Sequence, residues 1–237
     1  MNHERNSFIR RSARNLNRQL WSSRKDFGRP IETPADLMPI DLQFVVTELL
    51  KLKLEEPEEI PAETLGPGLG PEYAGFLDRN AGVIAVAQKF DPVWRRFTMA
   101  HEIGHWVLHP DLVQMREHPF MGGERSDKNR PPKEQEADLF AAELLMPSKY
   151  LSKLFLDTFG GPVDGRTPSD SLAYSLSVGT NQTINPRKLV SRGLRYRSLL
   201  IAATNFYDQR QFCPLADHFG VSSTAMAIQL EDLGLVK

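Results

Sequence analysis

The 237-residue sequence is poor in cysteine and contains no long apolar run. Its single cysteine, Cys213, cannot form an internal disulfide, which is typical of a protein in a reducing compartment. No segment approaches the run of about 18 apolar residues that a membrane span needs, and the N-terminus lacks the apolar core of a secretory signal. The net charge of −1 gives no general attraction to nucleic acid or to a membrane. We therefore expect a cytoplasmic globular protein with no membrane partner.

The most informative segment is the pentapeptide His101-Glu102-Ile103-Gly104-His105. Residues four apart on a helix share one face, so the two imidazoles can bind one metal ion. Glu102 lies on the next row, within reach of a water molecule on that metal, whose pKa zinc lowers to about 7. The motif predicts His101 and His105 as zinc ligands and Glu102 as a general base. The alternative is a buried helix whose histidines are satisfied by other core groups.

The flanking residues predict that the pentapeptide lies on a buried helix. Asp91-Pro92 is a typical helix start, and Pro110 ends the helix after His109. The helix is apolar nearly all round, so its histidines and glutamate need buried partners, and a metal supplies one. His109 is eight residues from His101, about 12 Å along the axis, which is too far for all three histidines to share one ion. We interpret His109 as a core residue or as a support for a ligand.

A third ligand is expected, because catalytic zinc sites usually have three protein ligands. The next predicted helix runs from Lys133 to Met146, and Glu134 and Asp138 lie one turn apart at the edge of its apolar face. Glu136 and Glu143 are predicted to face water, so helical phase selects Glu134 as the ligand. Asp138 is placed to accept the second N–H of a ligating histidine, which fixes the tautomer of that histidine. The alternative for Glu134 and Asp138 is a solvated helix edge.

Two stretches together resemble the ImmA/IrrE family of zinc metallopeptidases. The first is Arg95-Arg96-Phe97-Thr98-Met99-Ala100 leading into His101–His105 and then Leu108-His109, and the second is the run from Glu134 to Pro147. The resemblance covers roughly Pro39 to Pro147 well and the C-terminal third loosely. It implies a thermolysin-like peptidase reduced to a minimal core, with one zinc ion bound by His101, His105 and Glu134, and with Glu102 as the base.

The resemblance also implies a substrate and shows one departure. Members of the family cleave helix-turn-helix transcriptional repressors and so switch on stress-response or mobile-element genes, which makes such a repressor the expected protein partner. The family usually has Asn where this chain has Asp138, and thermolysin-like enzymes have Asp there. Since Asp keeps an acceptor for a histidine N–H, we expect the site to tolerate the change.

We expect an α+β fold with four parts: a basic segment at 1–38, an HExxH metallopeptidase domain at 39–160, a polar linker at 161–187 and a C-terminal helical region at 188–237. The core should be mainly helical and zincin-like, with a small antiparallel sheet. Eight Lys or Arg residues against two acidic residues in positions 1–30 predict a partly ordered surface helix, with a binding arm or a transit peptide as other interpretations.

The sheet and the loop beside the predicted metal helix are expected to serve the substrate. Tyr73 to Leu77 and Val83 to Ala87 predict a hairpin, whose second strand would offer an edge to an extended peptide. Residues 110–132 predict a long loop, which could overhang the site. Its residues His118, Asp111 and Asp127 are possible fourth ligands, and Tyr150 and His118 are the candidate donors to the oxyanion of the reaction.

The segment from Leu215 to Ser222, with the apolar positions that follow it, is typical of a helix-turn-helix. Residues 213–237 carry three acidic side chains against Lys237, whereas a DNA-reading helix should be basic. Direct binding of nucleic acid by this tail is therefore not expected. The alternative to an enzyme is a regulator that binds DNA or a repressor and carries a structural metal, but such a site has no need of Glu102.

Overall fold

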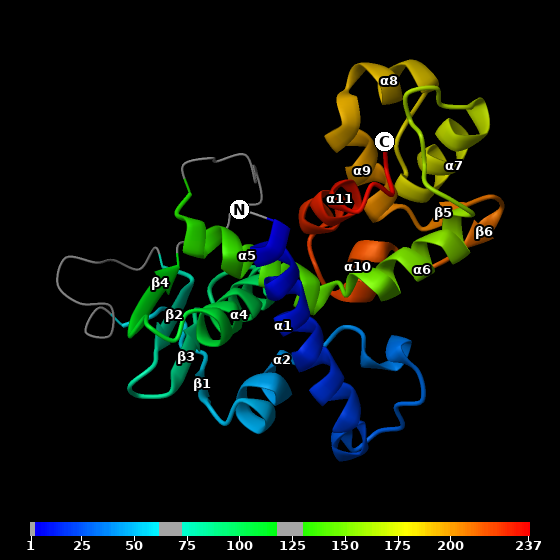
Figure 1. The fold of residues 1–237 in the computed structure, drawn as a ribbon. Coiled ribbons are helices and arrows are strands. Elements are labelled where there is room, and N and C mark those ends of the chain that lie inside the picture. Colours follow the sequence, from blue (N-terminus) through cyan, green and yellow to red (C-terminus); the bar gives the residue numbers. More distant parts are fainter. Residues whose placement is uncertain (1–2, 62–72, 118–129) are drawn as a thin grey trace. The chain divides into compact units, whose positions relative to one another are not determined.

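The computed structural model describes residues 3–61, 73–117 and 130–237 (Figure 1). The chain forms two compact units, Met1–Leu145 and Met146–Lys237. This division differs from the four expected parts, because the basic segment 1–38 belongs to the first unit. Residues 161–187, which we expected to be a linker, contain a helix, α7 (Asp170–Thr180). The candidate ligands His118 and Asp127 lie outside the described residues.

The first unit combines helices with one small sheet, and the fold class is α+β as predicted. Helix α1 (His3–Ser22) is followed by two short 3-10 helices, Arg24–Phe27 and Pro34–Leu37. Asp41 caps α2 (Leu42–Phe44) by accepting from the Phe44 N–H, and a π-helical turn, Val45–Leu49, continues that helix. The main helices of the site are α4 (Pro92–Leu108) and α5 (Pro132–Leu145).

The sheet has four strands in the order β1-β3-β2-β4. The predicted hairpin is present as antiparallel β2 (Gly75–Asp78) and β3 (Val83–Val86). Strand β1 (Lys53–Glu55) pairs with β3 in parallel, and β4 (Gln114–Glu117) pairs with β2 antiparallel. The sheet is therefore mixed, not antiparallel, and β3 is an inner strand. The expectation that Val83 to Ala87 offers a free edge was wrong, because two short charged strands cover the hairpin on both sides.

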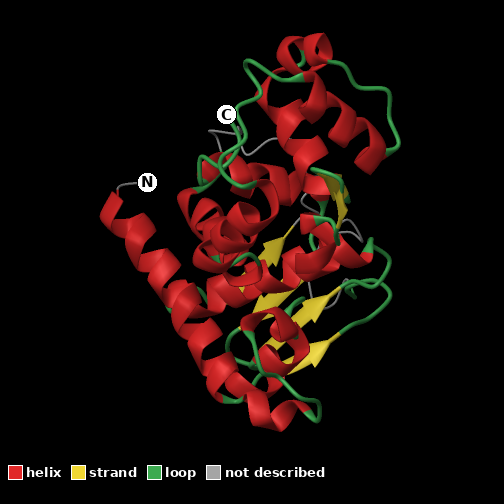
Figure 2. Cartoon of the chain, turned by 90° about the vertical axis from the view of Figure 1, so that its right-hand side faces the viewer, coloured by secondary structure: helices red, strands yellow, loops and turns green. Residues whose placement is uncertain are grey.

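Helix α4 contacts strands β2 and β3 of this sheet, and the cartoon in Figure 2 shows the strands lying among helices. Asp91 begins the helix by accepting a hydrogen bond from the Val93 N–H, as predicted. Side chains alternate between the two faces of a strand, and Leu77, Ile84 and Val86 on the α4 side have no exposed surface. The opposite face is covered in part by an apolar cluster formed by Ile60, Phe76, Ala85 and Ala87, with Tyr73 and Phe90 packed against it.

Helix α1 lies along α5, although more than 100 residues separate them in the sequence (Figure 1). Its buried residues Ile9, Ala13, Leu16 and Leu20 recur at helical spacing and form its inner face. Arg10 Nη1 and Arg14 Nε donate to the carboxylate of Glu143 over 2.9 and 2.7 Å. Glu143 is fully buried, so the expectation that it faces water was wrong. The arginines of α1 offset the cost of burying that charge.

Arg79, in the turn between β2 and β3, holds the C-terminal end of α4. Its Nη2 donates to the carbonyls of His105, Trp106 and His109 over 3.2, 2.7 and 3.2 Å, and its Nε donates to Leu112 over 3.0 Å. The guanidinium also lies over the Trp106 ring, 4.2 Å from its centroid. The last carbonyls of a helix have no partner within the helix, and a cation at that end is favourable. One side chain thus links the hairpin to the helix that carries His101 and His105.

Replacing Arg79 by alanine should therefore lower the free energy of unfolding by roughly 1–3 kcal/mol, since several charge-assisted bonds to carbonyls are lost. Chemical denaturation followed by circular dichroism measures the change. Asn80→Ala, at the exposed neighbour in the same turn, is the control and should stay within about 0.5 kcal/mol of the wild type. Equal stability of the two variants would contradict this role for Arg79.

The second unit is mainly helical, with a two-stranded ribbon of β5 (Phe206–Tyr207) and β6 (Arg210–Gln211). Its helices are α6 (Ser148–Phe159), α7, α8 (Pro186–Ser191), α9 (Gly193–Ala203), α10 (Leu215–Phe219) and α11 (Ser223–Asp232). Helices α10 and α11 meet at Gly220, which has φ 62°, and form the expected helix-turn-helix. Six consecutive residues of α11, 225–230, are buried, so this helix is a core element. Within the described ranges, no helix has the length and apolar character that crossing a membrane requires.

Candidate metal centre

Helices α4 and α5 bring His101, His105 and Glu134 together. The Nε2 atoms of the two histidines are 2.9 Å apart. Glu134 Oε2 lies 3.0 Å from His101 Nε2, and Glu134 Oε1 lies 3.4 Å from His105 Nε2. Both histidines are about 1% exposed. Three potential ligand atoms from two helices therefore face one point in the interior of the first unit.

Gly104 allows this convergence because it lets the two helices approach closely. A Cβ atom at position 104 would lie 3.2 Å from both the Cα and the carbonyl oxygen of Ala137 and 3.2 Å from a ring carbon of Phe140. Backbone atoms of α5 cannot move aside as a side chain can. The glycine and alanine at this crossing thus set the short separation across which Glu134 reaches His101 and His105.

The donor set fits a zinc ion. The ligand atoms of His101, His105 and Glu134 all lie within 4.8 Å of one another. A tetrahedral ion with bonds of about 2.0–2.1 Å holds its ligand atoms roughly 3.3 Å apart, close to the separations found here. Two imidazole nitrogens and one carboxylate oxygen are also the ligand types of catalytic zinc sites that keep a fourth position for water or substrate.

Asp138 lies one turn after Glu134 and contacts the other nitrogen of His101. Its Oδ1 atom is 3.0 Å from His101 Nδ1. Since an ionised carboxylate can only accept, Nδ1 donates to it and Nε2 is left with a lone pair directed towards Glu134 and His105. This is the geometry expected of Asp138 from the sequence.

Glu102 is buried beside strand β2, at a position made possible by Gly75. The glutamate is 0% exposed. A Cβ atom at position 75 would lie 2.6 Å from the Thr98 methyl group and closer still to Glu102 Oε1. The absence of a side chain at position 75 of β2 is therefore what leaves room for the Glu102 carboxylate, on the residue that follows His101.

The sequence of this region matches a known family. Residues 68–164 match the family model of the IrrE N-terminal-like domain, a peptidase family. This match supports the resemblance of the region to the ImmA/IrrE family. The matched segment includes β2, β3, α4, β4, α5 and α6, and so contains His101, Glu102, His105 and Glu134. Among curated proteins, none matches the chain.

In this IrrE-like domain His109 contacts His105. Nδ1 of His109 lies 3.0 Å from Nδ1 of His105, and Nε2 of His109 lies 2.9 Å from Glu136 Oε2. Glu136 in turn accepts from Nε and Nη2 of Arg5, on helix α1, over 2.8 and 2.5 Å. The expectation that Glu136 points to water was wrong, because α1 and the end of α4 enclose it. Its side chain is 12% exposed.

Burial and charge affect the ionisation of this cluster. Burial lowers the pKa of the His105 imidazole, and Glu134 opposes that shift without reversing it. The neutral imidazole is the form that binds a metal. The hydrogen bonds from Arg5, followed by that from His109, lower the pKa of Glu136 to about 2. Glu136 is therefore a carboxylate, and hence an acceptor, at neutral pH.

Two charged residues of the site were not predicted from the sequence. Arg5 is more than 100 positions from Glu136, and no local pattern connects them. Arg130 lies one turn before Glu134, with its guanidinium 3.5 Å from Glu134 Oε2 and 3.6 Å from Asp138 Oδ2. The i,i+4 spacing of Arg130 and Glu134 was a signal that could have been used. Asp111, considered as a fourth ligand, is exposed and pairs instead with Lys133 over 2.6 Å.

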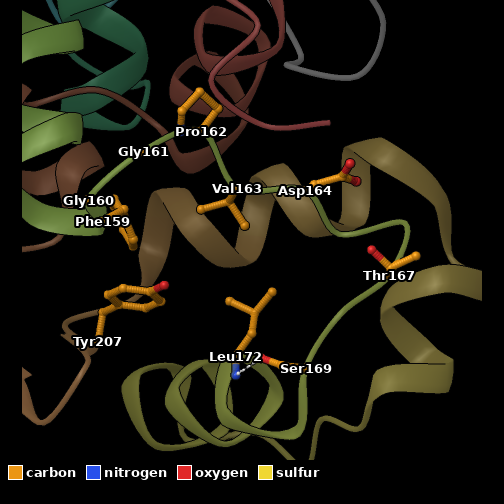
Figure 3. Close-up of a pocket in the computed structure, with 10 residues that line it drawn as sticks. All are labelled: Phe159, Gly160, Gly161, Pro162, Val163, Asp164, Thr167, Ser169, Leu172 and Tyr207. Atoms are coloured by element: carbon orange, nitrogen blue, oxygen red, sulfur yellow. Dashed lines mark hydrogen bonds between the residues drawn. The ribbon is translucent and has the colours of Figure 1, made fainter.

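Other candidate groups belong to the second unit. Tyr150, considered as an oxyanion donor, makes a 2.8 Å hydrogen bond with His218 Nε2. A pocket of about 360 Å³ lies between α6, α7 and β5 and is lined in part by Phe159, Val163 and Tyr207 (Figure 3). Ser169 at its rim accepts from the Leu172 N–H as the cap of α7. The acidic lining residue Asp164 pairs with Arg166, so this pocket shows no catalytic arrangement.

Gly75→Ala should lower peptidase activity on the order of 100-fold, because displacement of a catalytic group by about 1 Å can cost that much. Stability should also fall by roughly 1–3 kcal/mol from overpacking. Zinc content should remain, since the ligands lie on α4 and α5. Peptide hydrolysis, thermal melting and metal analysis measure the three effects. Gly161→Ala is the control, since no atom lies within 4 Å of its added Cβ. Full activity of Gly75→Ala would contradict the packing argument.

Proposed function

We propose that the protein is a cytoplasmic zinc endopeptidase that cleaves a helix-turn-helix transcriptional repressor and so triggers a stress or mobile-element response. The observation that carries the proposal is the meeting of His101 Nε2, His105 Nε2 and the Glu134 carboxylate, with the buried Glu102 directly after His101 in the sequence. The match of residues 68–164 to the IrrE N-terminal-like peptidase domain supports hydrolysis of a peptide bond. The repressor as substrate rests on the family resemblance alone.

The residues of the site divide the chemistry between them. His101, His105 and Glu134 would hold one zinc ion per chain. The zinc ion supplies Lewis acidity, which polarises a carbonyl group and acidifies water. Glu102 takes a proton from the attacking water and then passes it to the nitrogen of the leaving amine.

The edge of the sheet offers a place for an extended peptide. Strand β4 lies at one end of the strand order, pairs with β2 on its inner side and contacts α4. A strand at the edge of a sheet presents backbone groups that can pair with a peptide whatever its side chains are. We assign to β4 the role first expected of Val83 to Ala87, and the inner strand β3 then serves as support.

A regulator that binds DNA through its tail is less well supported. Helix α11 contains no lysine or arginine, and residues 225–230 face its own core. A reading helix needs basic side chains and an exposed face. A purely structural metal site would also leave the burial of Glu102 beside the ligands without a purpose.

Variants of the zinc ligands and a variant of the base should differ in zinc content. His101→Ala, His105→Ala and Glu134→Ala should each lose zinc and lower the melting temperature, since metal binding stabilises the folded state. Glu102→Gln should keep zinc and lose roughly 10²–10⁴-fold in cleavage rate, because an amide cannot accept the proton. Metal analysis and a cleavage assay on each purified variant test both points. Unimpaired proteolysis by Glu102→Gln would rule out this mechanism.

Cleavage should be selective. Incubated with zinc, the intact chain should cut a co-encoded helix-turn-helix repressor at one or a few bonds and leave denatured casein uncut. Mass spectrometry of the products identifies the bonds, and Glu102→Gln is the control for contaminating proteases. Broad digestion of casein would indicate an unspecialised peptidase in place of a repressor-specific one.

A further inference from the structure

A continuous series of side-chain contacts leads from helix α1 to a predicted metal ligand. Arg5 donates to both oxygens of Glu136, Glu136 Oε2 contacts His109 Nε2 over 2.9 Å, and His109 Nδ1 contacts His105 Nδ1 over 3.0 Å. His109 is 2% exposed. The series starts at the surface, where Arg5 is 37% exposed, and ends at a nearly inaccessible imidazole.

The chemistry of the groups gives each contact a direction. Glu136 accepts two hydrogen bonds from Arg5 and, as a carboxylate, can only accept. His109 Nε2 must therefore carry a proton and donate a hydrogen bond to Glu136. In a neutral imidazole the other nitrogen is then an acceptor. His109 Nδ1 therefore accepts from His105 Nδ1–H, and this leaves His105 Nε2 with its lone pair. Nε2 is the atom of His105 that faces His101 Nε2 and Glu134.

We propose that helix α1 completes the metal centre: Arg5, Glu136 and His109 are positioning residues that fix His105 as its Nδ1–H tautomer, so that Nε2 is free to bind the metal. The inference rests on the proposed function in one respect, namely that His105 is a zinc ligand. For His101, Asp138 performs the same task in a single contact. His105 has no direct contact of this kind with a carboxylate in the series: His109 lies between it and Glu136, and Arg5 of helix α1 holds Glu136 in place. Three residues therefore do for His105 what Asp138 does for His101.

The other contacts of α1 separate this role from simple packing. Arg10 and Arg14 pair with Glu143, and Asn17 Nδ2 donates to the Leu144 carbonyl over 3.2 Å. These bonds join the same two helices as Arg5 does, but none of them involves Glu136 or His109. Arg14→Ala is therefore a matched control for Arg5→Ala, since each removes one α1–α5 ion pair.

Zinc affinity of the full-length chain, measured by competition with a chromophoric chelator, tests the proposal. Supports of this kind typically contribute 10–100-fold to metal affinity, so His109→Leu should weaken zinc binding roughly 10–100-fold. His109→Gln can both accept from His105 and donate to Glu136, and it should restore much of the affinity. Arg5→Ala should weaken zinc binding roughly three- to tenfold. Arg14→Ala should keep a zinc affinity within about twofold of the wild type, although it should lose as much thermal stability as Arg5→Ala does.

Nitrogen-15 spectra of histidine-labelled, zinc-loaded protein report which nitrogen of His105 and of His109 carries the proton. This assignment would not change in Arg5→Ala if Arg5 only stabilised the fold. Long-range proton–nitrogen correlations should show His105 protonated at Nδ1, and His109 protonated at Nε2 with a bare Nδ1. In Arg5→Ala the two His109 nitrogens should move towards averaged shifts, and in Arg14→Ala they should not. A proton on His109 Nδ1 in the wild type would overturn the assignment.

The outcomes distinguish this inference from the proposed function. A wild-type chain that binds no zinc would overturn both. Zinc binding by the wild type that is equally tight in Arg5→Ala and His109→Leu would overturn only the role of α1, and the peptidase proposal would stand. Equal losses in Arg5→Ala and Arg14→Ala would show that α1 acts through general stability alone.

Discussion

The close crossing of α4 and α5 is the constraint on which the first unit depends. Gly104 meets the backbone of Ala137, and at this separation one carboxylate on α5 can reach imidazoles on two successive turns of α4. A Cβ atom at position 104 would press on that backbone, so a larger residue there would move the two helices apart. The sheet contacts α4 and helix α1 contacts both α4 and α5. On the sheet side, Gly75 of β2 leaves room for the Glu102 carboxylate, and Arg79 fixes the end of α4.

Ion pairs with buried carboxylates, in addition to apolar packing, attach α1 to this unit. Helix α5 carries Glu134, Glu136, Asp138 and Glu143, and all four are at most partly exposed. Such carboxylates are costly to bury unless cations or metals compensate them. The arginines of α1 compensate Glu136 and Glu143, and Arg130 lies beside Glu134 and Asp138. The excess of basic residues at the N-terminus is thus the complement of an acidic helix in the same chain.

Local patterns were sufficient to predict the parts of the site that lie within one helical turn or one cap. The spacing of His101 and His105, the Asp91 cap and the i,i+4 relation of Glu134 and Asp138 are properties of single segments. The expectations that failed concern partners on α1, β1 and β4, which no local pattern connects to the residues they cover. Glu136 and Glu143 looked solvent-facing because α1, more than 100 residues away, was not known to cover them, and Val83 to Ala87 looked like an edge because β1 and β4 are too short and too charged to show a strand period.

The second unit shows how a sequence motif can be present without its usual function. Gly220 and the Ser222 cap produce a turn between α10 and α11 with the local geometry that a helix-turn-helix requires. The second helix nevertheless buries residues 225–230, and its Gln229 donates to the Met146 carbonyl over 3.4 Å. A helix that is buried on every side over these residues has no face left there for a nucleic acid. The motif therefore builds the core of the unit.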